Sequence, residues 1–178
     1  ELLRTVNVVD DPTVLPVGGP GRGASPANFV GFTLGDVLKH NRPGAKVVGV
    51  SMKDRAAILM AGPRGDAAYW YEQATGEFIS STYYMKSAPP WLDQINRRRV
   101  PDSYGGKSWT RLADDPGVYL KYAGEDNVST EADTKNTVFP HALPAAGTPA
   151  LYDSFRRTPF MDELTLEVAL QAMNAHGL

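Results

Sequence analysis

Apolar residues recur at helical spacing from residue 34 onward. Thr33 is a typical N-cap residue and Asp36 occupies the N3 position of the helix that would follow. The apolar residues on one face of this helix are Leu34, Val37 and Leu38. Turn-forming residues at 41–44 interrupt the pattern. The spacing therefore predicts a short helix that begins after Thr33 and ends near residue 41.

The next apolar run has the pattern of a buried strand. Residues 46–51 are rich in Val and alternate little, which is typical of a strand covered on both faces in a parallel sheet. A helix followed by such a strand suggests half of a βαβ unit. Because no second run of this quality follows, we expect the other strands of the sheet to lie outside residues 1–178.

Two strand-like runs, AAYWYE and EFISSTYY, flank the turn-forming residues 73–76. They predict an antiparallel hairpin. One face of the hairpin should be aromatic, because residues of the same face alternate along each strand. This face is built from Tyr69, Tyr71 and Phe78, with Tyr83 as a further candidate.

Prolines mark the starts of two later helices. Pro90 can open a helix that carries Trp91, Leu92 and Ile95 and ends before Pro101. Pro159 and the acids that follow it predict a helix that ends at Gly177. The second helix is apolar on more than one face, so we expect it to be covered by partners beyond this chain.

Composition and charge exclude several classes of function. The chain has 178 residues, 42% of them hydrophobic and 21% charged, which is typical of a globular protein. A net charge of −2 and a longest cationic run of only three arginines argue against nucleic-acid binding. No apolar run approaches the roughly 18 to 20 residues of a membrane helix. The absence of cysteine excludes disulfides and thiolate chemistry.

Lys53 and Arg55 are the candidate catalytic and substrate-binding residues. They follow the predicted buried strand, where open α/β sheets place ligands at the carboxyl ends of their strands. A Lys point charge and an Arg fork can together hold the oxygens of a phosphoryl group, and a monoester carries more negative charge than a diester. Asp54 lies between the two cations and should point elsewhere. The alternative is that these three residues form a solvated turn that closes the strand.

The string GVSMKDRAAILMAG, followed by AYWY and STYYM, closely resembles the PafA-like alkaline phosphatases. These belong to a superfamily that also contains type I phosphodiesterases and nucleotide pyrophosphatases. The resemblance is strong over about residues 24–92 and thin between about 100 and 150. It implies two zinc ions beside a Thr nucleophile, an Asn that helps to hold the phosphate, and a Lys and an Arg on the phosphate oxygens. Only the last two roles have matching residues here, Lys53 and Arg55.

The other residues of the family's site have no counterpart in this chain. The resemblance places the nucleophile and the Asn before residue 1, and a second set of zinc ligands after residue 178. The three histidines, His40, His141 and His176, are isolated in sequence and are expected to be non-catalytic. We therefore expect an internal fragment that is inactive and binds no metal by itself, whereas the full-length parent holds two zinc ions.

The expected fold class is α/β, with a partial alkaline-phosphatase-like core of one buried strand and flanking helices, an inserted antiparallel cap hairpin and much irregular chain. Within one larger catalytic domain, residues 1–31 would form an N-terminal arm and residues 32–62 the core helix and strand with the Lys-Asp-Arg motif. Residues 63–150 would form a cap region, irregular over 101–150. Residues 151–178 would form a helix that returns to the core.

The expected function is part of a zinc-dependent phosphomonoesterase, periplasmic or secreted, that acts on phosphate monoesters. Its expected partner is the remainder of its own polypeptide, with no nucleic acid and no membrane. Two alternatives remain open. The first is a fragment of a phosphodiesterase or nucleotide pyrophosphatase. The second is a stand-alone module that binds ligands through its aromatic residues, which are Tyr69, Trp70, Tyr71, Tyr83, Tyr84 and Trp91.

Overall fold

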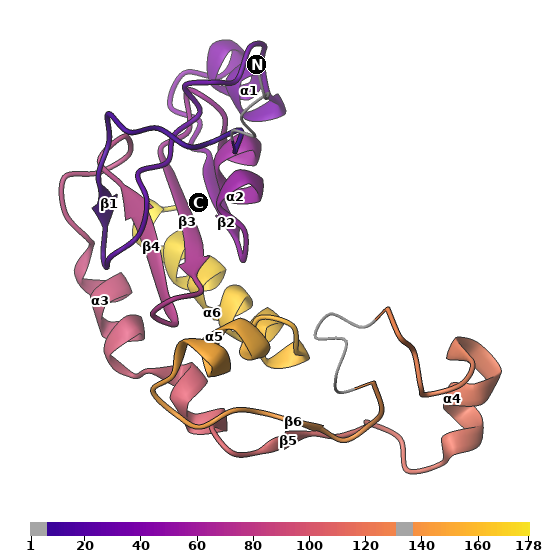
Figure 1. Ribbon diagram of the computed structural model, residues 1–178. Coiled ribbons are helices and arrows are strands. Elements are labelled where there is room, and N and C mark those ends of the chain that lie inside the picture. The colour runs from indigo at the N-terminus through magenta and orange to yellow at the C-terminus, as the bar shows by residue number, and fades with distance from the viewer. Residues whose placement is uncertain (1–6, 131–136) are drawn as a thin grey trace, which may run out of the picture.

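A computed structural model describes residues 7–130 and 137–178 as a mixed α/β fold (Figure 1). The helices are α1 (Leu34–Asn41), α2 (Asp54–Ala61), α3 (Pro90–Arg97), α4 (Pro116–Ala123), α5 (Pro149–Phe155), α6 (Pro159–His176) and a 3-10 helix, η1 (Val100–Tyr104). The strands are β1 (Pro16–Val17), β2 (Val48–Ser51), β3 (Ala67–Glu72), β4 (Glu77–Ser81), β5 (Ser108–Trp109) and β6 (His141–Ala142). The predicted α/β class is confirmed.

Four of the strands form one sheet in the order β1-β4-β3-β2. β3 and β4 form the predicted antiparallel hairpin, in which Tyr71 lies opposite Phe78. β1 pairs antiparallel with the other side of β4. β2 pairs in parallel with β3, with Val50 opposite Tyr69. The hairpin therefore shares a sheet with the strand that carries the Lys-Asp-Arg motif.

The pairing of β2 with β3 makes a βαβ unit around α2. We expected no second parallel strand within the chain, and that expectation is wrong. The run that forms β3 was predicted only as a hairpin strand, but β3 is also the parallel neighbour of β2, and its first five residues are buried. The outer edge of β2 has no partner strand in the part of the chain that the structure describes. Strands beyond this chain, and a cap region at residues 63–150, remain predictions.

The predicted capping box begins α1 and is confirmed. The amide of Asp36 donates to the Thr33 hydroxyl oxygen, and the Asp36 carboxylate accepts a hydrogen bond of 2.8 Å from the Thr33 amide. The helix buries Gly35 and Asp36 rather than its apolar face. Leu34 is 87% exposed, so the apolar pattern that identified this helix is not a pattern of burial within this chain.

The sheet separates two apolar clusters. On one face, side chains of α3, α5 and α6 pack with Tyr69, Tyr71 and Phe78. On the other face, α2 packs with Trp70 and Ile79. Figure 1 shows the yellow α6 and the purple α2 on opposite sides of the sheet. β3 and β4 both contribute side chains to the two clusters, so the hairpin holds the layers together.

α6 begins and ends as the sequence predicts, with Thr158 as N-cap and Gly177 as C-cap. Its buried face consists of Met161, Leu164, Val168 and Ala172. Its opposite face leaves Leu166, Leu170 and Met173 about half exposed or more. Cover for that second face by a partner stays a prediction. In residues 7–130 and 137–178, no helix is long and apolar enough to cross a membrane.

The aromatic face of the hairpin is core. Tyr69, Tyr71 and Phe78 are 1%, 6% and 1% exposed, as expected for the inner face of a covered sheet. Tyr83 does not belong to this face: it is 41% exposed, and its hydroxyl donates to the carbonyl of Pro63. Buried rings cannot stack on a ligand, so this burial argues against the alternative of an aromatic binding module.

Residues 101–150 were predicted to be irregular, and this is wrong in part. Asp115 caps α4 by accepting a hydrogen bond from the amide of Gly117, and Pro116 occupies the first helical position. β5 and β6 pair as a short ribbon that leads away from the sheet to α4 (Figure 1). None of the α4 residues is buried, so this helix lacked the apolar periodicity by which buried helices are detected.

Candidate functional site

A cavity of about 440 Å³ opens beyond the carboxyl ends of β2 and β3. Open α/β sheets bind ligands in this position. Lys53 and Arg55 both line the cavity. Its other charged side chains are Asp10, Arg22, Asp54, Glu72 and Arg156. Among the described residues, four cations therefore face three carboxylates, which makes the cavity suitable for an anion.

Close packing of α2 on β2 fixes the positions of the two cations. A Cβ atom added at Gly49 would lie 2.0 Å from the carbonyl oxygen of Ala57, so only glycine allows the helix to approach this closely. The chain leaves β2 at Ser51 and enters α2 at Asp54, with Lys53 as the N-cap residue in extended backbone. The amino end of α2, where the helix dipole favours anions, therefore borders the cavity.

The side chains of Lys53 and Arg55 are available to a ligand. Both residues are exposed, and neither forms an ion pair within the described ranges, 7–130 and 137–178. Asp54 is occupied elsewhere: its carboxylate accepts 2.6 Å from the amide of Arg55 and 3.2 Å from the Asn7 side chain. It therefore does not neutralise either neighbouring cation.

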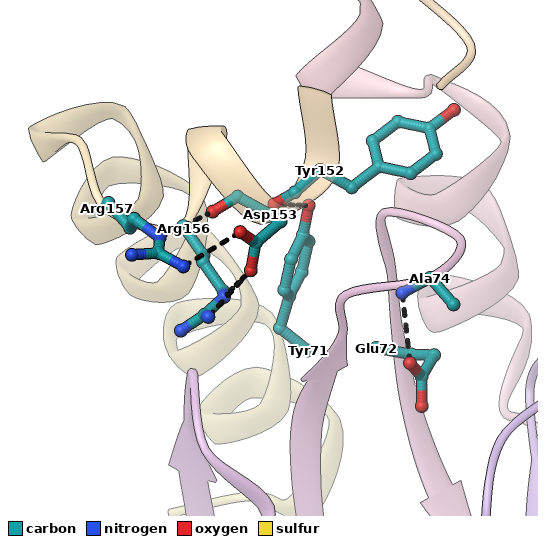
Figure 2. Close-up of polar contacts among 7 residues, drawn as sticks. All are labelled: Tyr71, Glu72, Ala74, Tyr152, Asp153, Arg156 and Arg157. Carbon is teal, nitrogen blue, oxygen red and sulfur yellow. Dashed lines mark hydrogen bonds and ion pairs between the residues drawn. The ribbon is translucent and has the colours of Figure 1, made fainter. Parts of the chain in front are cut away.

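The remaining carboxylates of the cavity already have partners. Asp10 lies 3.5 Å from a terminal nitrogen of Arg22. Glu72 accepts a hydrogen bond of 3.0 Å from the amide of Ala74 and so closes the hairpin turn (Figure 2). The charge of Asp10 is therefore offset by that of Arg22, whereas Glu72 is bonded to a neutral amide and keeps its charge.

α5 is tied to the end of β3, and the residue that follows this helix, Arg156, lines the cavity. The hydroxyl of Tyr71 donates to the backbone carbonyl of Tyr152 over 3.3 Å (Figure 2). Burial raises the pKa of Tyr71 above its ordinary value, so this hydroxyl keeps its proton. The Tyr152 ring packs under Gly76, where an added Cβ would lie 2.7 Å from the ring. The hairpin turn and α5 thus form one unit.

Arg156, the C-cap residue of α5, lines the cavity. Its Nε donates to Asp153 Oδ1 over 2.8 Å, and an Nη2 atom lies 2.6 Å from the same oxygen. Arg157 contacts the second oxygen of Asp153 at 2.8 Å (Figure 2). Burial by itself raises the pKa of Asp153, but the bonds from Arg156 and Arg157 outweigh it and hold that pKa below its usual range.

The histidines lie outside this cavity. His176 Nε2 is 3.1 Å from the Tyr69 hydroxyl, and burial lowers the pKa of His176. His141 packs against Trp109 in the ribbon of β5 and β6. No group of three or more His, Cys, Asp or Glu side chains that could hold a metal ion occurs in the described part of the chain.

Sequence reasoning selected Lys53 and Arg55, and the structure brings both into one cavity. It missed Arg22 and Arg156, which line the same cavity from distant parts of the chain. Arg22 lies in a glycine-rich loop with no motif. For Arg156 the available signal was the spacing Asp153 to Arg156, which lets the two side chains meet on one helix, although this spacing is common on helix surfaces.

Several curated relatives match the chain. Alkaline phosphatase PafA from Elizabethkingia meningoseptica is 37% identical over 100% of this chain and 34% of its own length. A protein from Myroides odoratus named calcium-transporting ATPase is 36% identical over 94% of this chain and 31% of its own length. Alkaline phosphatase PhoV from Synechococcus elongatus is 33% identical over 100% of this chain and 33% of its own length. The chain thus spans about a third of the length of these relatives. No family model matches it.

The fold is similar to crystal structures of alkaline phosphatase PafA. The wild-type enzyme matches with a TM-score of 0.77 and 36% identity, over 95% of this chain and 34% of that one. A variant of PafA with substitutions of a Thr, an Asn, a Lys and an Arg matches with a TM-score of 0.78 and 35% identity. The match covers 97% of this chain and 35% of the variant's chain. The predicted resemblance to PafA-like alkaline phosphatases, over part of their fold, is confirmed.

Proposed function

We propose that residues 1–178 supply the phosphate-binding part of an alkaline phosphatase, a phosphoric monoester hydrolase. The observation that supports this most strongly is the shared cavity of Lys53 and Arg55 at the amino end of α2. In the PafA variant named above, the substituted Lys and Arg are two positions apart, as Lys53 and Arg55 are. The similarity to PafA and PhoV supports the same reaction class.

Lys53 and Arg55 act on the oxygens of the phosphoryl group. Their charges attract the dianion of a monoester more strongly than the monoanion of a diester. As the bond to the leaving group breaks, negative charge on the phosphoryl oxygens and the leaving oxygen has to be stabilised. Fixed cations beside those oxygens lower the barrier, because they need little reorientation during the reaction.

The resemblance also implies two zinc ions, which in a phosphatase would polarise the ester and activate water. The described residues contain no cluster of three or more possible ligands, so they do not fit a zinc site on their own. We extend the proposal accordingly: the zinc ligands, the threonine nucleophile and the asparagine belong to other segments of a longer polypeptide. Residues 1–178 then bind phosphate without catalysing hydrolysis, and the whole protein works in the periplasm or outside the cell.

Two other activities compete with this proposal. The first is a phosphodiesterase or nucleotide pyrophosphatase of the same superfamily. The second is suggested by the relative named calcium-transporting ATPase, because an ATPase also cleaves a bond to a phosphoryl group. The pair of exposed cations favours the most highly charged phosphoryl group, and so a monoester over a diester.

The test uses the full-length protein that carries these residues. Turnover of p-nitrophenyl phosphate, bis(p-nitrophenyl) phosphate and ATP is compared for the wild type and for Lys53→Ala, Arg55→Ala and the control Arg42→Ala. Arg42 is an exposed cation outside the cavity. Each cavity variant should lower monoester turnover by roughly 100-fold, as the loss of one transition-state donor does in other enzymes. The Arg42 variant should match the wild type.

A preference for the diester or for ATP, or equal monoester turnover in all four proteins, would refute the proposal. A second measurement addresses residues 1–178 alone. Mixed with zinc and p-nitrophenyl phosphate, this chain should show no turnover. Turnover that disappears on Lys53→Ala would show instead that the chain is a complete catalyst.

A further inference from the structure

The cavity is larger than a single phosphate group requires. Its volume of about 440 Å³ falls within the range of about 300 to 1,000 Å³ that is usual for small-molecule sites. Lys53 and Arg55 line the cavity where β2 passes into α2, and Arg156 lines it from the residue that follows α5. A phosphate held by the two cations therefore leaves room for the alcohol part of an ester.

Arg156, the C-cap residue of α5, is the cation that this part of the chain contributes to the cavity. Asp153 Oδ1 accepts from its Nε at 2.8 Å and contacts its Nη2 at 2.6 Å. A guanidinium group has five N–H donors, so this contact leaves most of them unused. Because Asp153 holds one edge of the fork, the group is fixed in direction and can still bind an acceptor along its other edge.

Several contacts hold the residues behind Arg156 in place. Asp153 is shared with Arg157, and the preceding residue, Tyr152, accepts the hydrogen bond from Tyr71 (Figure 2). The side chain of Arg156 is 25% exposed, whereas that of Arg22, the other additional cation of the cavity, is 83% exposed and 3.5 Å from its partner. Arg156 is therefore preorganised in a way that Arg22 is not.

We propose that Arg156 is a specificity-determining residue that binds a second anionic group on the alcohol part of the substrate. The preferred substrates are phosphate monoesters that also carry a carboxylate or a further phosphate. This inference rests on the proposed phosphomonoesterase function and adds to it the class of leaving group. Arg156 makes the same contact before and during bond cleavage, so it acts mainly on KM.

The experiment compares phenyl phosphate with 4-carboxyphenyl phosphate in the full-length protein. Arg156→Met should lower kcat/KM for the carboxylated ester about tenfold, which one charge-assisted hydrogen bond can supply. For phenyl phosphate, kcat/KM of this variant should stay within about twofold of the wild-type value. Arg157→Met is the matched control, because Arg157 shares Asp153 but does not line the cavity. Arg157→Met should change kcat/KM by no more than about twofold for either substrate.

Arg156→Lys keeps a positive charge that can pair with Asp153. It is the second variant, which keeps the test decisive if Arg156→Met misfolds. It should recover part of the preference for the carboxylated ester, and both variants should retain the wild-type unfolding temperature within a few degrees. An unchanged ratio of the two substrates in Arg156→Met, or an equal loss for both, overturns the inference and leaves the proposed function intact. If the wild type hydrolyses neither ester, both the inference and the proposed function are overturned.

Discussion

The hydroxyl of Tyr71, near the end of β3, donates a 3.3 Å hydrogen bond to the backbone carbonyl of Tyr152 in α5. Tyr71 is 6% exposed and Tyr152 is 3% exposed, so water does not compete for this bond. The contact joins two elements that are 81 positions apart in sequence. Through it, the strand end that lines the cavity and the helix that carries Arg156 are held in one arrangement.

Removing this bond should weaken the fold by a small, measurable amount. Tyr71→Phe keeps the ring and deletes the hydroxyl, so we expect the free energy of unfolding in urea to fall by about 1 kcal/mol. Tyr83→Phe is the matched control, because that hydroxyl donates to the Pro63 carbonyl at an exposed site where water can replace it. Equal losses in the two variants would contradict the structural role assigned to Tyr71.

Gly49 should tolerate no side chain. An added Cβ would lie 2.0 Å from the Ala57 carbonyl oxygen, so Gly49→Ala forces α2 away from β2. We expect a loss of about 3 kcal/mol in the free energy of unfolding, at the upper end for overpacking. Ser51→Ala, in the same strand, adds no volume and serves as the control. A Gly49→Ala protein as stable as the control would show that α2 does not lie directly on β2.

The two faces of α6 should respond differently to the same substitution. Leu164 is 4% exposed and faces the sheet, whereas Leu166 is 60% exposed. Leu164→Ala should therefore cost about 2 to 5 kcal/mol of stability. Leu166→Ala should stay within about 0.5 kcal/mol of the wild type. Thermal or urea unfolding of residues 1–178 measures both, and a reversed order would place the other face of α6 against the sheet.

Acid should weaken the capping box of α1. Burial by itself raises the pKa of Asp36, but the bonds from Thr33 and from the amide of Arg64 outweigh it and leave that pKa lowered. Because the folded pKa is the lower one, the stability that Asp36 contributes is complete above its unfolded pKa of about 4 and disappears as pH falls through the folded value.

Urea unfolding at about pH 7, 5 and 3 tests this effect. The Asp36→Asn protein should have a lower free energy of unfolding than the wild type near neutral pH. Its free energy of unfolding should also fall less when the pH is lowered. Asp162→Asn, which alters an exposed carboxylate in the first turn of α6, is the matched control. A wild-type pH dependence in the Asp36 variant would mean that this carboxylate is not held by the cap.

Local signals in the sequence were sufficient for the helix termini. Thr33 and Asp36 identified the start of α1, and Pro159 and Gly177 bounded α6, because caps depend on residues that are neighbours in sequence. Strand pairing depends on partners that the local pattern does not name. The run that forms β3 predicted a strand, but nothing in it indicated that β2 would be its parallel neighbour.

The candidate site divides in the same way. Lys53 and Arg55 were found because they follow a run with the pattern of a buried strand and match a family motif, although in β2 itself only Gly49 is fully buried. Arg156 is about 100 positions away and reaches the cavity only because Gly76 packs on Tyr152 and Tyr71 bonds to α5. Such a contact is a product of tertiary packing, so it could be seen only once the fold was known.

Binding of inorganic phosphate tests the central claim most directly, because it needs no assumption about the nucleophile or the alcohol. Isothermal titration calorimetry of the full-length protein should show phosphate binding that weakens roughly 100-fold when Lys53 and Arg55 are both replaced by Ala, with each charged contact contributing about 1.4 kcal/mol or more. The Arg42→Ala protein should bind phosphate as the wild type does. Equal affinity in the double variant and the wild type would show that the two cations do not hold the phosphate.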